Sequence, residues 1–437
     1  MRSVALAPRI VLVHRHFPGQ FRYLVMAWLR RGVVIDAIGA RPAEEVGALL
    51  QQQDQPLSFT YWELPDPLAP ASAPLDVDLE SALRRGEALA ELARGLRDGE
   101  GLHPDAVICH SGWGEGLHLH AVWPKAVLLA YPELYGSPRC LGYGFDPRQP
   151  PISPQLEACI DRQNLLASAA VLGADGAVVP TRFQRDSFPA PLQGRLHLIH
   201  EGIDASLACP NPEARFHCGD GLVLRPGDPV ITVACRSLEP LRGIEPMLEA
   251  LPALMRARPD LQVVLAGHAT RPGYGGVSSH PGGFLGELLE QLQGRLDFSR
   301  LHAVGWLPLD QLIALFQVSA AHIYLSYPYT LSWSVLQAMA CGAAVVGNGD
   351  GPLAEVIEPG RNGLLVNFND PPALAGAVLR LLQDPAWRRA LGAEARRTVQ
   401  QRFAVDWAAE AYLDLISQLA KPCSTASTSP GQSPAAG

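Results

Sequence analysis

Residues 326–342 read SYPYTLSWSVLQAMACG, and this stretch decides how the second half of the chain folds. Its first part is rich in Tyr, Pro and Ser, which are typical of a loop, and its second part carries apolar residues at helical spacing. Ser332 stands where the N-cap of a helix belongs. The stretch is therefore predicted to be a loop that turns abruptly into a buried helix, beside the chain's best candidates for binding an anion.

Short apolar runs rich in Val and Ile alternate with helical patterns along the whole chain, which is typical of parallel α/β proteins. We expect each run to be a strand that is buried on both faces of a parallel sheet. In the first half the predicted strands are residues 10–13, 33–38, 106–109, 126–129, 176–179 and 196–199. In the second half they are residues 230–234, 262–266, 301–304, 322–325, 343–346 and 363–366.

The length of 437 residues indicates two domains, since one hydrophobic core rarely extends beyond about 250–300 residues. The predicted fold class is α/β, with two doubly wound, Rossmann-like domains that face each other across a cleft and bind ligands at the carboxyl ends of their strands. A helix over residues 405–419 is expected to pack across the junction between the domains. The predicted division is an N-terminal domain (1–203), a hinge or linker (204–229), a C-terminal domain with terminal helices (230–420) and a disordered tail (421–437).

Composition and charge exclude several classes of protein. Apolar residues make up 48% of the chain, yet no apolar run reaches the roughly 18 residues of a membrane span, and the N-terminus lacks the pattern of a secretory signal peptide. The eight cysteines show no CxxC spacing, which favours reduced thiols, and the net charge of −8 argues against nucleic-acid binding. We therefore expect a cytoplasmic protein. The apolar and arginine-containing segment 28–31 leaves open a peripheral contact at the inner face of the cell membrane.

Arg236 and Arg242 form the most specific pattern for binding an anion. They lie where a predicted strand turns into a helix that begins near Gly243. Two guanidinium groups and the free N–H groups of a helix start can together hold a diphosphate. A pair of solvated arginines is the structural alternative.

The loop within residues 326–342 offers a second positive pole. The backbone N–H groups of Ser332, Trp333 and Ser334 are expected to point into the cleft, and Gln337 lies about one turn inside the helix. This pole would face the same diphosphate as the arginine pair.

Two patterns imitate metal sites without completing one. The pairs His14/His16 and His118/His120 have a spacing of two residues, but no third cluster of ligands accompanies them. Residues 76–78 read DVD, which imitates a DxD metal motif but precedes a helical pattern and fits a helix N-cap better. No metal is expected.

With these residues in place, the segment 326–342 resembles the donor site of retaining family-4 glycosyltransferases, also called glycosyl transferases group 1. The resemblance spans most of residues 9–415. It continues in the second half through Glu355 and NGLLV at 362–366. In the first half four motifs resemble a bacterial subgroup of the family. They are HFPGQF at 16–21, GWGE at 112–115, GFDP at 144–147 and TRFQ at 181–184.

The resemblance implies a GT-B glycosyltransferase that moves a sugar from a nucleoside diphosphate sugar to a glycan, a lipid-linked or another acceptor, with retention and without a metal or another cofactor. Cell-envelope polysaccharide synthesis is the setting that it implies. Arg236 and Arg242 would stabilise the leaving diphosphate, and His110, at the end of a predicted strand, would contact the donor sugar near its reacting carbon. The acceptor would lie against Gly19, His110 and Trp113.

The sequence departs from the family within the implied donor site. Family members usually have two glutamates eight positions apart in this segment, and this chain has Tyr329 and Gln337 instead. The first glutamate contacts the donor sugar, and the second accepts hydrogen bonds from both ribose hydroxyls. Gln337 therefore offers one uncharged acceptor, and Tyr329 cannot act as a carboxylate. The other residues implied for the donor site are Gly19, Gly243, Ser332, Trp333, Ser334 and Glu355.

Two other functions stay open. A catalytically degenerate protein of the same fold could bind nucleotide sugars or act as a scaffold, because both glutamates are replaced. A nucleotide-sugar epimerase would share the fold, although the motifs resemble transferases throughout.

Overall fold

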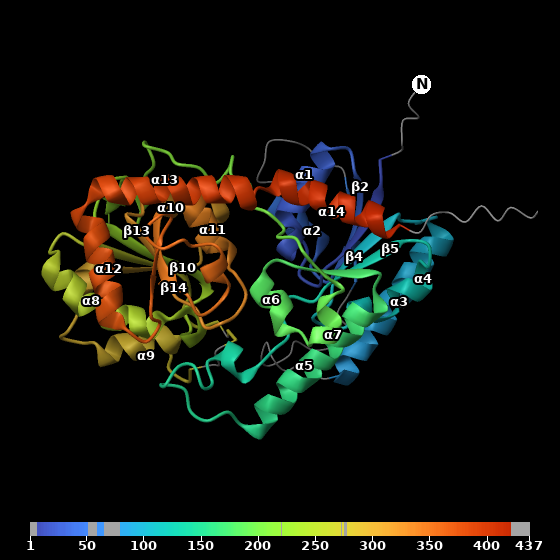
Figure 1. The fold of residues 1–437 in the computed structure, drawn as a ribbon, viewed down its shortest axis with the longest axis horizontal. Coiled ribbons are helices and arrows are strands. Elements are labelled where there is room, and N and C mark those ends of the chain that lie inside the picture. The colour runs from blue at the N-terminus through green and yellow to red at the C-terminus, as the bar shows by residue number, and fades with distance from the viewer. Residues whose placement is uncertain are drawn as a thin grey trace, which may run out of the picture.

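The computed structural model describes residues 7–50, 59–64, 79–219, 221–271, 273–274 and 278–420. These residues form two α/β halves that lie side by side, one coloured blue to green and the other mainly yellow to red (Figure 1). Each half is a parallel sheet covered by helices. One buried core lies within each half, and a larger one contains residues of both.

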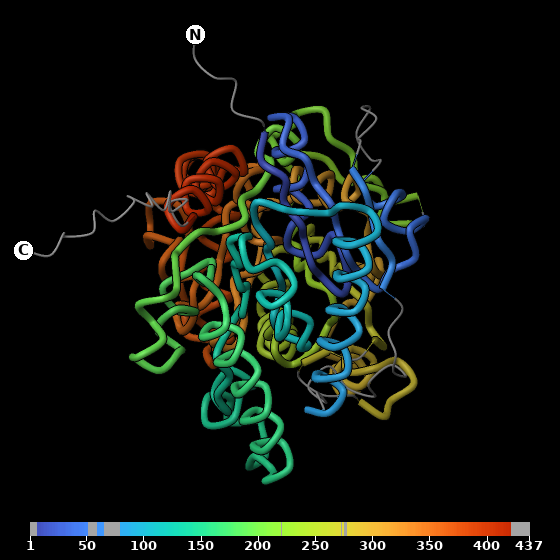
Figure 2. The backbone as a smooth tube through the Cα atoms, turned by 90° about the vertical axis from the view of Figure 1, so that its right-hand side faces the viewer, coloured from blue at the N-terminus to red at the C-terminus, as the bar shows by residue number. Residues whose placement is uncertain are grey.

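The first half contains a seven-stranded sheet in the order β3-β2-β1-β4-β5-β6-β7. Every neighbouring pair in it is parallel. Its strands are β1 (Arg9–Val13), β2 (Val34–Gly39), β3 (Thr60–Glu63), β4 (Ala106–His110), β5 (Val127–Tyr131), β6 (Gly176–Val179) and β7 (Leu196–Leu198). Its helices are α1 (Arg22–Arg30), α2 (Ala43–Leu50), α3 (Leu79–Gly99), α4 (Leu119–Val122), α5 (Pro154–Gly173), α6 (Arg182–Ser187) and α7 (Ala190–Gln193). In the view turned by 90°, α5 lies at the lower end of the molecule (Figure 2).

The second half contains a six-stranded parallel sheet in the order β12-β11-β10-β13-β14-β15. Its strands are β10 (Val230–Ser237), β11 (Gln262–His268), β12 (Leu301–Gly305), β13 (Ala321–Tyr324), β14 (Ala344–Asn348) and β15 (Leu364–Val366). The helices that follow β10 are α8 (Ile244–Ala257), α9 (Gly283–Gln291), α10 (Leu309–Val318), α11 (Trp333–Ala340), α12 (Pro371–Gln383), α13 (Pro385–Arg402) and α14 (Val405–Leu419).

A strand is present at each predicted position, and the predicted class of two doubly wound α/β domains is confirmed. Burial on both faces, predicted for every strand, is wrong for β12. This strand lies at the edge of its sheet, and all five of its residues are partly or fully exposed. The sequence also did not predict β3, which is an edge strand of the first sheet.

Residues 204–229, expected to be a hinge or linker, fold against the rest of the chain. They contain two short antiparallel strands, β8 (Phe216–His217) and β9 (Val223–Leu224). Ala208, Ala214, Phe216 and Leu224 are buried within the larger core. This connection is therefore held in place by burial of its apolar side chains.

The last helix returns to the first half. Figure 1 shows α13 across the top of the second half and α14 beside α1 of the first. Trp28 Nε1 on α1 donates a hydrogen bond of 3.0 Å to the backbone oxygen of Ala409, and Arg31 pairs with Asp406 at 2.8 Å. The α14 helix thus ties the two ends of the chain together. None of the described helices is long and apolar enough to cross a membrane.

Candidate functional site

The strand order places the loops of both halves around one cleft. In each sheet the order reverses between the first and fourth strands, β1 and β4 in one half and β10 and β13 in the other. Loops diverge at such a switch point and leave a crevice at the carboxyl edge of the sheet, where ligands bind. Three adjoining cavities of about 90, 320 and 320 Å³ lie there. They are lined from both halves, and the lining includes Gly19, Gln20, His110, Trp113, Glu133, Arg236, Tyr274, Tyr329, Ser332 and Trp333.

Seven of the residues predicted for the site line these cavities, namely Gly19, His110, Trp113, Arg236, Tyr329, Ser332 and Trp333. The other five do not line them, and these are Arg242, Gly243, Ser334, Gln337 and Glu355.

The turn from β10 to α8 carries both predicted arginines. Arg236 is exposed, and its guanidinium lies over the ring of Tyr274, 5.3 Å from the ring centre. Arg242 Nη1 is buried and has no hydrogen-bond partner among the residues that the structure describes. Burial alone would lower the pKa of Arg242, but Tyr324 and Glu239 outweigh it and raise that pKa. The turn therefore carries two permanent positive charges, one of which retains an unused donor.

Gly243 allows the turn to pack tightly. Its φ of +60° lies in the left-handed region that favours glycine, and a Cβ there would stand 2.3 Å from the Cβ of Leu325. The helix α8 consequently starts directly against the end of β13.

The start of α11 is the predicted N-cap, but two of the three N–H groups expected to point into the cleft, those of Ser332 and Ser334, donate to groups of the protein itself. The Ser332 hydroxyl accepts a hydrogen bond from the backbone N–H of Ser334 at 3.3 Å, which is an N-cap. Ser332 N donates to Tyr324 Oη at 3.0 Å, and Trp333 Nε1 donates to Glu201 Oε1 at 3.0 Å. The loop is thus fixed from both halves of the molecule.

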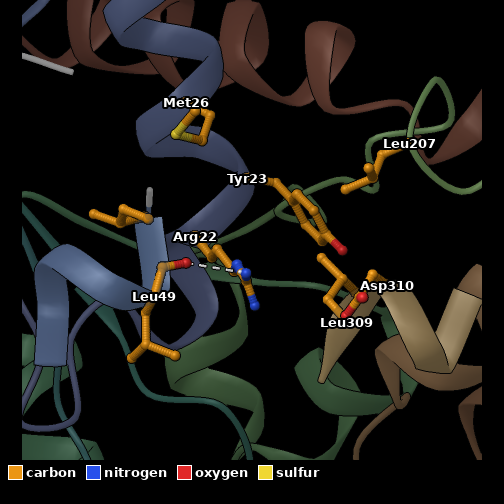
Figure 3. A pocket seen from close by; sticks show the side chains of 8 residues that line it. Arg22, Tyr23, Met26, Leu49, Leu207, Leu309 and Asp310 are labelled. Carbon is orange, nitrogen blue, oxygen red and sulfur yellow. Dashed lines mark hydrogen bonds between the residues drawn. The ribbon is translucent and has the colours of Figure 1, made fainter. Parts of the chain in front are cut away.

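Gln337 takes part in a contact between the two halves. Its Nε2 donates to Tyr23 Oη at 2.7 Å, and both side chains are buried. Tyr23 also lies 5.0 Å from the Trp333 ring and lines a separate cavity of about 310 Å³. In Figure 3, Tyr23 points from α1 toward Leu309 and Asp310 of α10, and Arg22 donates to the backbone oxygen of Leu49. The sequence did not predict this mostly apolar cavity.

Glu355 lies between the halves and away from the cavities. Its carboxylate accepts hydrogen bonds from the backbone N–H groups of Arg182 at 3.0 Å and Phe183 at 2.6 Å, at the start of α6. This geometry makes Glu355 a contact between the two halves, whereas the sequence analysis placed it at the donor.

His110 ends β4 and reaches the cleft. Its ring stacks on Trp113 at 4.3 Å, and its side chain is 2% exposed. Its Nδ1 accepts a hydrogen bond of 3.3 Å from the N–H of Gly112. The proton of the neutral ring therefore belongs on Nε2, which faces Glu133 Oε2 at 3.6 Å.

Glu133 is the site residue that the sequence analysis missed. It has a φ of +57°, a conformation that costs a residue other than glycine on the order of 1–3 kcal/mol. Gln20 Nε2 donates to its Oε1 at 2.5 Å. Burial works to raise the pKa of the Glu133 carboxyl, but the nearby His110 ring, the hydrogen bond from Gln20 and the charge of Arg236 outweigh it and lower that pKa. Glu133 is therefore a carboxylate at neutral pH. Its one signal in the sequence is that an acid closely follows a predicted strand.

Gln20 connects Glu133 to a second histidine. His14 Nδ1 accepts from the N–H of His16 at 2.9 Å, so its Nε2 donates to Gln20 Oε1 at 2.5 Å. Burial lowers the pKa of His14 well below its usual value and keeps this ring neutral. Gly19 has a φ of +45°, and a Cβ there would lie 2.2 Å from the His14 ring.

No group of three His, Cys, Asp or Glu side chains within the described ranges could hold a metal ion. Asp76 and Asp78 of the DxD-like sequence lie outside the residues that the structure describes.

Two family matches divide the chain at the same place as the structure. Residues 43–208 match the "Glycosyl transferase family 4 group", and residues 228–384 match "Glycosyl transferases group 1". Both halves of the chain are therefore similar to glycosyltransferases of this kind. The first match begins after residues 16–21, so assignment to the bacterial subgroup with HFPGQF stays a prediction.

Relatives of known name are glycosyltransferases or synthases. The chain is 27% identical to the alpha-maltose-1-phosphate synthase of Mycolicibacterium smegmatis over 64% of this chain and 73% of that protein. It is also 27% identical to the D-inositol 3-phosphate glycosyltransferase of a Nocardioides species, over 46% of this chain and 44% of that protein. The match thus reaches less than half of the length of the second relative.

Solved structures share the fold over nearly the whole chain. The sucrose-phosphate synthase of Thermosynechococcus elongatus has a TM-score of 0.70 and 20% identity, and covers 94% of this chain and 99% of its own. Anabaena HepE in complex with UDP-glucose has a TM-score of 0.65 and 14% identity, and covers 94% of this chain and all of its own. At these identities the likeness shows the GT-B fold.

Proposed function

We propose that this protein transfers a sugar from a nucleoside diphosphate sugar to a hydroxyl of a glycan, lipid-linked or other acceptor, with retention and without a metal. One observation carries the proposal, which is the arginine pair at the switch point of the second sheet. Arg236 lines two of the cavities, and the nearby Arg242 has a buried Nη1 without a partner in the described part of the chain. A diphosphate would use both cations and the N–H group of Trp333 at the start of α11.

The proposed reaction breaks the bond between the anomeric carbon and the diphosphate oxygen, whose electron pair leaves with the diphosphate. The acceptor oxygen forms the new bond on the same face of the sugar. The acceptor proton passes to the departing diphosphate oxygen, which balances the step. Two fixed cations stabilise the negative charge that grows on the leaving group, and this is the role that a metal has in other transferases.

The acceptor would lie on the first half, against Gly19, His110 and Trp113, where two of the cavities meet this half. HepE was crystallised with UDP-glucose, and a Mycolicibacterium relative is a GDP-mannose-dependent mannosyltransferase that acts on a phosphatidylinositol monomannoside. A cytoplasmic role in cell-envelope polysaccharide synthesis, with peripheral contact to the membrane, fits such acceptors.

A thermal-shift screen of UDP, GDP, ADP and dTDP, each alone and as its sugar, tests the proposal. A bound ligand raises the melting temperature by mass action, even when the acceptor is unknown. Calorimetry then gives the dissociation constant, and release of nucleotide from the sugar gives turnover. We expect turnover to be unchanged by EDTA. Absence of binding by every nucleotide would overturn the proposal.

A second function is favoured by the residues at positions 329 and 337. A tyrosine and a glutamine stand where the resemblance implies carboxylates, so a protein that binds nucleotide sugars without transferring them is the alternative. Tight binding together with no release of sugar would support it.

A further inference from the structure

Glu133 lies at the centre of the cleft and has no role in the function described so far. It follows β5 and lines all three cavities, and among the lining residues named above it alone does so. Arg236 lines two of the same cavities, and Tyr274 and Tyr329 line the smallest one with Glu133. The carboxylate therefore lies where spaces bounded by both halves meet.

The surroundings of Glu133 hold its carboxylate in one orientation. Gln20 donates to Oε1, and His110 Nε2 faces Oε2. The backbone hydrogen bonds to the two histidine rings direct the protons of both toward this group, His14 through Gln20 and His110 directly. The side chain is still 30% exposed, so part of the carboxylate can accept hydrogen bonds from a ligand.

The backbone conformation of Glu133 costs stability, so folding alone does not explain why a glutamate stands at this position. Its φ of +57° is unfavourable for glutamate, and glycine or asparagine would adopt it more easily. Strained residues persist where the surrounding structure fixes them, and they are concentrated at functional sites.

The smallest cavity combines groups that suit a sugar ring. The rings of Tyr274 and Tyr329 are 5.3 Å apart on the side of the second half, and Trp113 stacks on His110 on the side of the first. Aromatic faces pack against the C–H surface of a sugar, and a carboxylate accepts hydrogen bonds from its hydroxyls.

The geometry points to Glu133 as the carboxylate that binds hydroxyls of the transferred sugar and stabilises the positive charge that develops on it as the bond to the diphosphate breaks. The inference rests on the proposed function, since Arg236 must hold the diphosphate. A cation on the leaving group and an anion beside the sugar stabilise opposite charges of one transition state. The other carboxylate that lines these cavities, Glu201, lines one of the three, and its Oε1 accepts hydrogen bonds from Tyr131 and Trp333.

The test compares Glu133→Gln and Glu133→Asn with Glu115→Gln. The glutamine keeps the size without the charge, and the asparagine suits the left-handed backbone, so at least one variant should fold. Glu115 is a matched control because it is a buried glutamate of the same half that lines none of the three cavities. The probes are UDP, UDP-glucose, GDP and GDP-mannose, measured by calorimetry and by release of sugar.

We expect both Glu133 variants to bind UDP or GDP within about twofold of the wild type. Their rate of sugar release should fall by about 100-fold or more. The extra affinity of the nucleotide sugar over the bare nucleotide should also fall, and Glu115→Gln should match the wild type. Unchanged sugar release, or equal losses of nucleotide affinity and turnover, would overturn this inference alone. Failure of the wild type to bind these four probes and also the ADP and dTDP ligands of the thermal-shift screen would instead overturn the proposed function, and this inference with it.

Discussion

The side chain of Gln337 is held by a hydrogen bond that its place in the sequence does not indicate. Its amide nitrogen donates to Tyr23, 314 positions away and in the other half of the molecule. The amide oxygen is the one acceptor left on this side chain, which is buried and lines none of the three cavities. A glutamate here would have two acceptor oxygens, one for Tyr23 Oη and one for a ribose hydroxyl.

We expect Gln337→Glu to tighten the binding of UDP or GDP by about tenfold, because one charge-assisted hydrogen bond adds roughly 1.4 kcal/mol. Calorimetry measures the two dissociation constants. Gln293→Glu adds the same charge at an exposed position of the second half and should leave affinity unchanged. Weaker binding by Gln337→Glu would show that the amide is the better partner for the ligand.

His322 predicts a dependence of stability on pH. This residue is fully buried, and burial lowers its pKa from 6.5 to about 3. The unfolded chain binds a proton that the folded protein excludes, so the contribution of this ring is complete above pH 6.5 and is lost as the pH falls toward 3. At pH 4.5 the loss is about 2–3 kcal/mol.

His322→Leu removes this titration while keeping the volume, and Thr232 keeps its hydrogen bond of 2.8 Å to Ser319. The fall in melting temperature between pH 7 and pH 4.5 should be smaller in the variant than in the wild type. Equal falls in both proteins would show that His322 does not carry this effect. Other buried histidines, such as His200, still titrate in the variant, so some dependence on pH should persist.

At the scale of elements, the turn from β10 to α8 holds the proposed diphosphate site. We expect Arg236→Ala and Arg242→Ala each to weaken UDP or GDP binding by roughly 2–4 kcal/mol, because each removes a charged donor from the same anion. Arg256→Ala, on the exposed face of α8, is the control and should bind normally. Unchanged affinity in both variants, with unchanged melting temperatures, would remove the donor site from this turn.

The sequence predicted the interior strands well because each is a run of Val, Ile, Leu or Ala with burial on both faces. It missed β3, whose residues Thr60–Glu63 are all partly or fully exposed, and β8 and β9, which have two residues each. Short or exposed strands lack the apolar run that makes a strand visible in a sequence.

Some residues of the candidate site could likewise be predicted from the sequence, and others could not. Arg236, His110 and Ser332 were predicted because each follows a strand or starts a helix, and such positions can be read from the sequence. Glu133 depends on a left-handed backbone and on Gln20, 113 positions away. Hydrogen bonds over such distances leave no periodic pattern in the sequence, so the structure was needed to find them.

The whole molecule is held closed by contacts from one half to the other. Tyr327 Oη of the second half donates to Asp146 of the first at 2.8 Å, and Arg148 donates to Asn369 at 2.9 Å. Glu355 adds a third contact at the start of α6. Closure of two such domains excludes water and so limits hydrolysis of the donor.

Glu355→Ala tests whether this residue joins the halves or binds the donor. Removing two charge-assisted hydrogen bonds should favour the open arrangement by about 1–2 kcal/mol. We then expect small-angle scattering to show a larger radius of gyration for the free variant than for the wild type, and saturating UDP or GDP to reduce that difference. Hydrolysis of the donor should rise relative to transfer, since an open cleft admits water. Glu358→Ala is the matched control, because Glu358 is exposed and pairs with Arg361 within the same half. If Glu355→Ala keeps the wild-type radius but loses nucleotide affinity, the contact between the halves is unimportant and the sequence analysis placed Glu355 correctly at the donor.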